Sequence, residues 1–170
     1  MPAAPGPGPL PESGDRGRAG GSLLILFLDA SALVKRYVAE PGRRELLAAV
    51  RKRKAAASRL SEVEIASALA RRCREGAFTD AERDRTVARL AADFRSLIVV
   101  ELSEAVTSRA IGLTARRSLR AGDALQLAAA LELRERLGEP IEFLAYDEKL
   151  REAARAEGFP MGGPSPARSK

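Results

Sequence analysis

The sequence predicts an α/β fold with a parallel sheet and helices on both of its faces. Short apolar runs, each about the length of a buried strand, alternate with longer segments of helical spacing. The expected strands are Leu23–Leu28, Ala55–Ser58, Leu97–Val100 and Ile141–Ala145. Because strands that alternate with helices join as crossover units, this pattern predicts a parallel sheet that is covered on both sides.

The stretch Leu23–Tyr37, LLILFLDASALVKRY, contains the first strand and the start of the first helix. Its apolar run breaks at Asp29, and Ser31–Tyr37 reads as the first turns of a helix. A carboxylate at the exit of a buried parallel strand faces the crevice where open α/β sheets bind ligands. Asp29 is therefore the first candidate functional residue.

Further helices are predicted from apolar spacing and from terminal residues. Leu60–Glu75 has the strongest pattern, with Ser61 as a plausible N-cap and Glu64 three residues later in the position of a capping box. The other expected helices are Arg43–Lys54, a segment from Thr79 or Asp80 to about Arg95, Ser103–Arg117, Gly122–Gly138 and Asp147–Gly158.

One domain is expected, because a chain of 170 residues is long enough for a single hydrophobic core. We place this domain at 22–159. Residues 1–21 are rich in Pro and Gly and have little to bury, which predicts a disordered arm, and 160–170 predict a flexible tail for the same reason. The apolar run before Asp29 is too short for a membrane span, and we expect neither a span nor a targeting segment.

The absence of histidine excludes several kinds of catalytic site. With no His in the chain, Ser-His and Cys-His nucleophiles, His-ligated zinc and His general bases are all ruled out. The single cysteine, Cys73, cannot form an internal disulfide, and its apolar neighbours predict a buried, inert thiol. This cysteine usage is consistent with a reducing, cytoplasmic setting.

The chain is basic, with a net charge of +6 and a pI of about 10.1. A basic surface favours a polyanionic partner, and nucleic acid is the first candidate. A genome that prefers Arg codons would explain the same composition without any partner. Candidate phosphate contacts are the basic residues at or near helix ends: Arg51–Lys54, Arg71, Arg72, Arg74, Arg116, Arg117 and Arg120.

Three aspartates share one kind of position at the start of a helix. Asp29 and Asp147 each follow an expected strand, and Asp123 lies in the first turn of the most Ala/Leu-rich helix. Each could simply cap its helix, since an Asp side chain accepts hydrogen bonds from free N–H groups there. However, the strands of a parallel sheet all end at one edge, so Asp29 and Asp147 must approach each other if their strands are neighbours.

Carboxylates that lie close together repel one another, and a hard divalent cation relieves this repulsion. Mg²⁺ or Mn²⁺ suits carboxylate and water ligands and can share its coordination with a substrate phosphate. Such an ion supports water activation and phosphodiester hydrolysis. Periodicity adds no fourth acid, because it places Glu62 on the apolar stripe of its helix and Glu64 on the other side with Ala68 and Arg71.

Four ordered blocks of the sequence resemble the PIN-domain nucleases, and most closely the VapC-type toxin ribonucleases of type II toxin–antitoxin systems. The blocks are FLDASALVKRY, SRLSEVEIASALARR, LRAGDALQLAAAL and FLAYDEKLREAARAEG. The resemblance implies a PIN-like three-layer α/β/α sandwich around a short, mostly parallel sheet. It also implies a Mg²⁺- or Mn²⁺-dependent endoribonuclease, a small cognate antitoxin and a homodimer.

The family pattern assigns roles to five residues of this chain. It implies Asp29, Glu64, Asp123 and Asp147 as the catalytic acids, with Asp29, Asp123 and Asp147 as metal ligands and Ser31 as a supporting hydroxyl. The alignment thus selects Glu64, where periodicity alone predicts a capping or solvated residue. The sequence departs from the pattern in two places: Ala145 replaces a hydroxyl residue, and Gln126 stands where relatives often have His.

Other classes of protein fit the sequence less well. A receiver domain needs paired acids near its first strand, and a haloacid-dehalogenase-like phosphatase needs an Asp at the position of Ser31. A catalytically silent PIN-like scaffold that binds RNA or protein remains the alternative function. Loss of one or more acids would mark such a scaffold, and all four are present.

Overall fold

The computed structural model describes residues 24–51 and 53–163. The elements follow the chain in the order β1 (Ile25–Leu28), α1 (Ala30–Leu33), η1 (Val34–Arg36), α2 (Arg43–Val50), β2 (Lys54–Ser58), α3 (Arg59–Arg74), α4 (Asp80–Phe94), β3 (Ile98–Val100), α5 (Glu104–Arg117), α6 (Ala121–Leu137), β4 (Ile141–Leu144) and α7 (Glu148–Ala156). The alternation of strands and helices is the one that the apolar runs predict. The α/β fold class is therefore confirmed.

The four strands form one sheet in the order β3-β2-β1-β4, and each pair is parallel. The register pairs Phe27 of β1 with Ala56 of β2 on one side and with Phe143 of β4 on the other. The rings of Phe27 and Phe143 stack with their centroids 5.6 Å apart. Because β1 and β4 are neighbours, the residues that follow them, Asp29 and Asp147, leave the sheet at the same edge.

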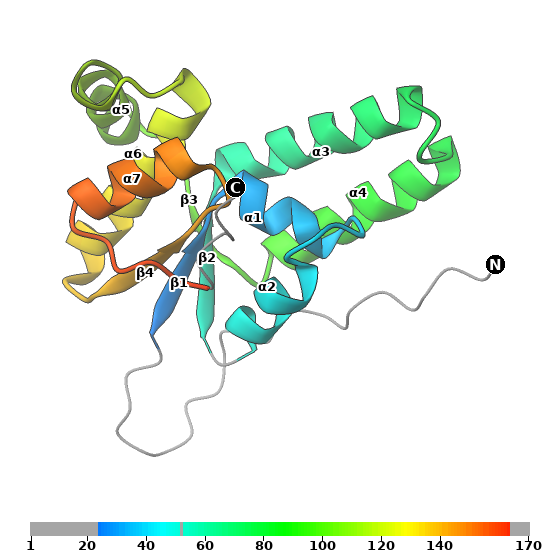
Figure 1. Cartoon of the computed structure of the whole chain (residues 1–170), viewed down its shortest axis with the longest axis horizontal. Helices are drawn as coiled ribbons and strands as arrows, with labels where there is room; N and C mark the ends of the chain where they lie inside the picture. Colours follow the sequence, from blue (N-terminus) through cyan, green and yellow to red (C-terminus); the bar gives the residue numbers. More distant parts are fainter. Residues whose placement is uncertain (1–23, 52, 164–170) are drawn as a thin grey trace, which may run out of the picture.

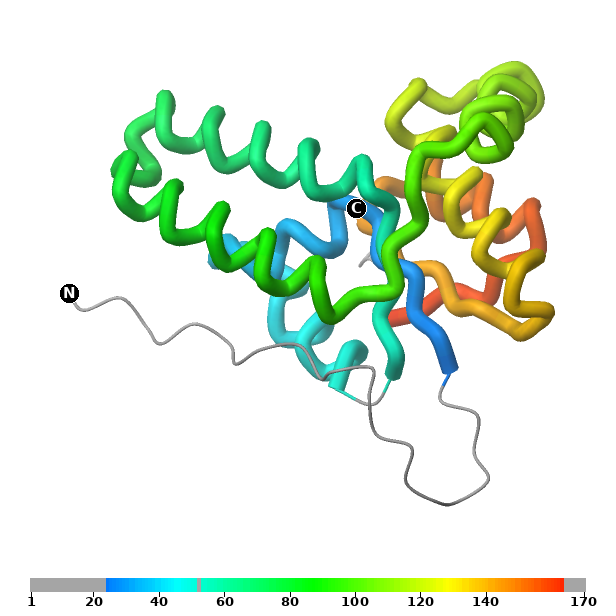
Figure 2. The backbone as a smooth tube through the Cα atoms, turned by 180° about the vertical axis from the view of Figure 1, so that it is seen from behind, coloured from blue at the N-terminus to red at the C-terminus, as the bar shows by residue number. Residues whose placement is uncertain are grey.

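Helices cover both faces of the sheet and complete a three-layer sandwich (Figure 1). Successive side chains of β1 point to opposite faces. Ile25 and Phe27 pack with α5, α6 and α7, whereas Leu26 and Leu28 pack with α1, α2, α3 and α4. The view from behind shows α3 and α4 as a long hairpin that extends away from the sheet (Figure 2). Among the described helices, none has the length and hydropathy required to cross a membrane.

The ends of the predicted domain are tested only in part. The predicted disordered arm, 1–21, and residues 164–170 of the predicted tail lie outside the described residues. The segment that follows Phe159 is not tail-like, because Phe143 of β4 donates its backbone N–H to Pro160 and accepts a hydrogen bond from Gly162 N–H. Met161 also forms a parallel bridge with Phe143. The ordered chain therefore continues past the predicted boundary at Phe159.

Two predictions about α3 are wrong: the position of its N-terminus and the burial of Cys73. The helix begins at Arg59 rather than Leu60, and its N-cap is Ser58, whose Oγ accepts a hydrogen bond from Leu60 N–H. Ser61 is consequently a buried residue of the first turn instead of a cap. Cys73 is not buried but partly exposed near the end of α3.

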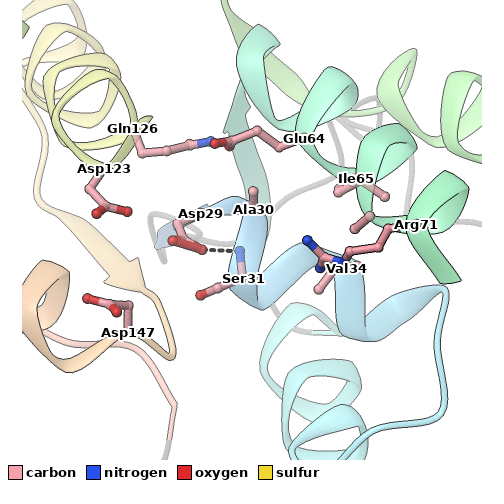
Figure 3. A pocket seen from close by; sticks show the side chains of 11 residues that line it. Asp29, Ala30, Ser31, Val34, Glu64, Ile65, Arg71, Asp123, Gln126 and Asp147 are labelled. Atoms are coloured by element: carbon pink, nitrogen blue, oxygen red, sulfur yellow. Dashed lines mark hydrogen bonds between the residues drawn. The ribbon is translucent and has the colours of Figure 1, made fainter. Parts of the chain in front are cut away.

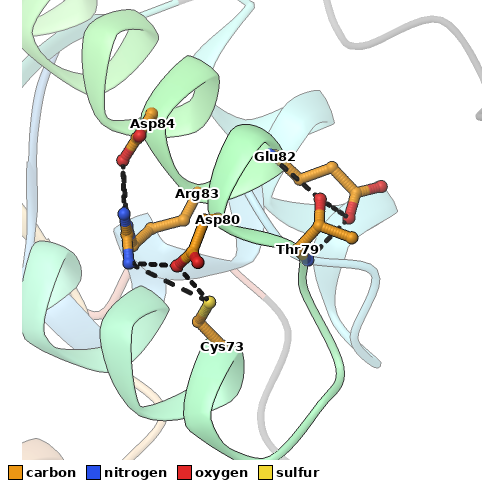
Figure 4. Close-up of polar contacts among 6 residues, drawn as sticks. All are labelled: Cys73, Thr79, Asp80, Glu82, Arg83 and Asp84. Atoms are coloured by element: carbon orange, nitrogen blue, oxygen red, sulfur yellow. Dashed lines mark hydrogen bonds and ion pairs between the residues drawn. The ribbon is translucent and has the colours of Figure 1, made fainter.

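Cys73 lies among polar side chains at the tip of the α3–α4 hairpin (Figure 4). Its Sγ lies 3.2 Å from an Asp80 carboxylate oxygen, and the same oxygen pairs with Arg83 at 2.6 Å. A capping box between Thr79 and Glu82 starts α4, as the prediction of a cap at Thr79 or Asp80 anticipated. The last turn of α3 thus faces the start of α4 rather than the core.

Candidate active site

All four candidate acids, together with Ser31, line one pocket of about 270 Å³ at the carboxyl edge of the sheet. Asp29 and Asp147 follow neighbouring strands, Glu64 comes from α3, and Asp123 comes from the first turn of α6. Asp29, Asp123 and Asp147 face a common space, and Glu64 meets Gln126 beside them (Figure 3). The fold thus brings together residues that are far apart in the sequence.

Asp29 lies at the bottom of the pocket and is only 4% exposed. As the N-cap of α1, its carboxylate accepts hydrogen bonds from the backbone N–H groups of Ser31 and Ala32. Burial outweighs these bonds and raises the pKa of Asp29 to about 7, with a smaller contribution from the charge of Glu64. The capping role predicted as the simpler alternative is real, but capping alone does not account for a nearly buried carboxylate.

Glu64 is half-buried and is held by a polar network between α3 and α6. Gln126, which is 2% exposed, donates from Nε2 to Glu64 Oε2 at 2.7 Å and to the Oγ of buried Ser61 at 2.8 Å. Burial raises the pKa of Glu64, the Gln126 bond opposes that shift, and the charge of Asp123 adds to it. The amide at position 126 therefore favours the charged form of Glu64.

Gly122 leaves room for the Glu64 carboxylate in this position. A Cβ atom at position 122 would lie 2.8 Å from Glu64 Oε1, so the end of the Glu64 side chain would have to move. Sequence reasoning missed this residue and the role of Ser61. The signal that could have identified Gly122 is a glycine in the first turn of an otherwise Ala/Leu-rich helix, where glycine is unfavourable.

Asp123 and Asp147 form the outer part of the pocket. Asp123 is half-buried and Asp147 is exposed. Burial raises the pKa of Asp123 and the nearby charge of Asp147 adds to this, whereas Arg120 and Lys149 oppose it. The N-cap of α6 is Arg120, and within the described residues the Asp123 carboxylate accepts no capping hydrogen bond. Asp147, by contrast, caps α7 through Leu150 N–H.

The segment that carries Asp147 is fixed on both sides. Ser31 Oγ accepts a hydrogen bond from Tyr146 N–H at 2.9 Å, and the buried Arg151 donates from Nη1 to the Ala145 carbonyl at 2.9 Å. Tyr146 in turn donates its hydroxyl to the Gly42 carbonyl. Ser31 thus links the start of α1 to the segment before Asp147, and these contacts hold that segment although Ala145 has no hydroxyl.

The donor set suits a hard divalent cation in kind, because it consists of carboxylates and a hydroxyl. As the side chains are placed, no group of three or more Asp, Glu, His or Cys residues in 24–51 and 53–163 is arranged to hold a metal ion. A site built here would therefore depend on water ligands or on side-chain rotation at the exposed rim. Mg²⁺ sites commonly keep several waters, so the residues remain compatible with such an ion.

Residues 26–156 match the PIN domain family model. The chain belongs to the PIN domain family. The matched range includes all four acids of the pocket. A comparison with curated proteins found no match.

Solved structures share this PIN fold at low sequence identity. VapC20 of Mycobacterium tuberculosis, described as a sarcin–ricin loop cleaving toxin, superimposes with a TM-score of 0.59 at 18% identity, covering 82% of this chain and 99% of that one. A toxin–antitoxin complex from Klebsiella pneumoniae has a TM-score of 0.54 at 19% identity, and the match covers 73% of this chain and 88% of that one. VapBC2 from Rickettsia felis, bound to a DNA fragment from its promoter, has a TM-score of 0.53 at 14% identity, and the match covers 76% of this chain and 92% of that one. The predicted resemblance to VapC-type PIN domains is confirmed at the level of fold.

Proposed function

We propose that this PIN-domain protein is a divalent-metal-dependent endoribonuclease and the toxin of a toxin–antitoxin pair. The observation that carries the proposal is the convergence of Asp29, Glu64, Asp123 and Asp147, from four separate elements, on one pocket. A structural role would not require these acids to share a pocket in which burial and mutual repulsion raise the pKa of three of them. Perturbed acids in a cleft are typical of functional sites.

Three of the acids would hold the cofactor. Asp29, Asp123 and Asp147 are the proposed ligands of Mg²⁺ or Mn²⁺, which when bound neutralises charge on the phosphate and lowers the pKa of water for hydrolysis. Ser31 keeps the segment before Asp147 in place through Tyr146. Glu64, oriented by Gln126, is the proposed residue that positions the attacking water.

The fold and the charge of the chain support an RNA substrate and an antitoxin partner. Solved structures of similar fold include a cleaving toxin and two toxin–antitoxin assemblies, which supports a cognate small antitoxin for this chain. The net charge of +6 favours a polyanionic substrate. A homodimer and a cytoplasmic setting belong to the same proposal.

The first test is RNA cleavage by the purified chain. We expect wild-type protein to cut RNA in Mg²⁺ or Mn²⁺ and EDTA to stop the reaction. Asp123→Asn should reduce the cleavage rate by at least about a hundredfold, since it removes one of the charged ligands proposed to hold the metal ion. Expression of wild-type protein alone should inhibit growth, and Asp123→Asn should not.

A matched control is Asp84→Asn, because Asp84 is an exposed residue of α4 outside the pocket. It should cleave RNA like wild type.

The competing function is a catalytically silent RNA- or protein-binding scaffold, which is favoured by the lack of a ready three-ligand arrangement among the described residues. RNA cleavage that Asp123→Asn leaves unchanged would contradict the proposed site, and a wild type without metal-dependent cleavage would favour the scaffold.

A further inference from the structure

Among the described residues, Arg71 is the one arginine that lines the acidic pocket. Glu64, Ala68 and Arg71 share a face of α3, because four residues separate the first two and three separate the last two. The Arg71 side chain reaches from α3 toward Val34 near the start of η1, at the end of the pocket away from Asp123 and Asp147 (Figure 3). The helix face that periodicity assigned to solvent is therefore the face that borders the site.

Arg71 carries a charge that no described carboxylate neutralises. It makes no ion pair with any residue in 24–51 or 53–163, and it is exposed. Three other candidate phosphate contacts are occupied in ion pairs: Arg72 with Glu40, Arg53 with Glu142 and Arg117 with Glu157. The remaining described candidates, which are Arg51, Lys54, Arg74, Arg116 and Arg120, do not line the pocket. The place of Arg71 in the pocket wall thus separates it from the other described candidates.

The position of Arg71 relative to the acids limits what it can contact. Arg120 and Lys149 lie close enough to Asp123 to lower its pKa. The Arg71 side chain lies at the other end of the pocket, beside Val34 (Figure 3). A group bound between the three aspartates would therefore lie apart from Arg71. An anion bound by Arg71 would be a neighbour of the reacting group.

We infer that Arg71 binds a phosphate of the RNA backbone that flanks the bond to be cut. This inference rests on the proposed function and extends it to the path of the substrate, which would enter the pocket along α3. A guanidinium offers a planar pair of N–H donors that matches two phosphate oxygens. Because every nucleotide carries such a phosphate, Arg71 contributes affinity and register but no base preference.

The test compares Arg71→Gln with Arg136→Gln. Both arginines are exposed and lie in the last turn of a helix, so each substitution removes the same charge from a similar helix end. Arg136 does not line the pocket. Binding of a labelled single-stranded RNA is measured in EDTA, where cleavage does not interfere, and KM and kcat are then measured separately with Mn²⁺.

Arg71→Gln should weaken RNA binding about tenfold and raise KM by a similar factor, as expected for one charged hydrogen-bonded contact. Its kcat should stay within about twofold of wild type, because a flanking contact binds substrate and transition state alike. The slope of log affinity against log salt should fall by about 0.7. The RNA affinity of Arg71→Lys should lie between those of wild type and Arg71→Gln. The RNA affinity and KM of Arg136→Gln should match those of wild type.

Equal RNA binding by Arg71→Gln and Arg136→Gln would overturn the inference while leaving cleavage by the wild type intact. A loss of kcat without a change in KM would also overturn it, since Arg71 would then act on the reacting phosphate. If wild-type protein neither binds nor cleaves RNA, the proposed function fails and the inference fails with it.

Discussion

Asp29 shows at the scale of one residue how a buried carboxylate acts against stability. Its side chain is 4% exposed and lies near Glu64, so the folded protein favours its neutral form. The pKa in the folded chain, about 7, is higher than the value of 3.8 for a solvated Asp. The stability linked to this shift is fully present below pH ~4 and is lost as the pH rises through ~7.

Asp29→Asn should therefore stabilise the metal-free protein at pH 8. The amide keeps an oxygen for the N–H groups of Ser31 and Ala32 but carries no charge. We expect a gain in the free energy of unfolding of at most roughly 4 kcal/mol at pH 8, at about 1.4 kcal/mol per pKa unit, and almost none at pH 4. Urea unfolding in EDTA across this range measures the difference.

Mn²⁺ supplies the control for this prediction. Added Mn²⁺ should raise the melting temperature of the wild type and have little effect on Asp29→Asn, because an ion stabilises only the state that binds it. A variant that is less stable than wild type at pH 8 in EDTA would show that the ionised carboxylate contributes favourably to the fold.

At the scale of elements, the helical segment that follows Asp29 is anchored to α4 by a buried ion pair. Arg36 Nε lies 2.7 Å from an Asp93 carboxylate oxygen, and Tyr37 donates its hydroxyl to the same oxygen at 3.0 Å. Arg36 and Asp93 are 3% and 5% exposed. This contact holds η1, and through it α1 with Asp29 and Ser31, against the α3–α4 hairpin.

Asp93→Ala should destabilise the protein by about 3–5 kcal/mol, the usual cost of removing one partner from a buried pair. Asp84→Ala on the same helix is the matched control, since Asp84 pairs with Arg83 at the surface and its side chain is 68% exposed. That substitution should change stability by no more than about 1 kcal/mol. Chemical denaturation compares them, and equal effects would mean that the Arg36–Asp93 contact does not anchor η1.

The sequence predicted the positions of the helices and strands better than it predicted which side of α3 packs against α6. Apolar runs and capping residues located the strands and most helix starts, including those of α4 and α5 at Thr79 and Ser103. In α3, however, apolar periodicity reports only the stripe that packs into the hydrophobic core. The side of α3 that meets α6 is polar, with Ser61, Glu64 and Gln126 in contact, so this packing left no apolar signal.

At the scale of the whole molecule, strand order determines the site. The order β3-β2-β1-β4 makes β1 and β4 neighbours, so Asp29 and Asp147 leave the same edge of the sheet. Sequence reasoning predicted this meeting as conditional on that neighbourhood, and the condition holds. Asp123 was expected from its position at a helix start, whereas Glu64 depended on family resemblance, because nothing in the periodicity of α3 points it toward the pocket.

The sharpest test of the account compares two neighbouring acids of α3. Glu64 faces the pocket, whereas Glu62 pairs with Arg59 outside it at 2.9 Å. The measurement is cleavage of end-labelled RNA in Mn²⁺, with mapping of the product ends, by wild type, Glu64→Gln and Glu62→Gln. We predict internal cuts by wild type and Glu62→Gln, and a loss of at least about a hundredfold in rate for Glu64→Gln. Equal cleavage by both variants, or cleavage that resists EDTA, would contradict a metal-dependent nuclease site built from these four acids.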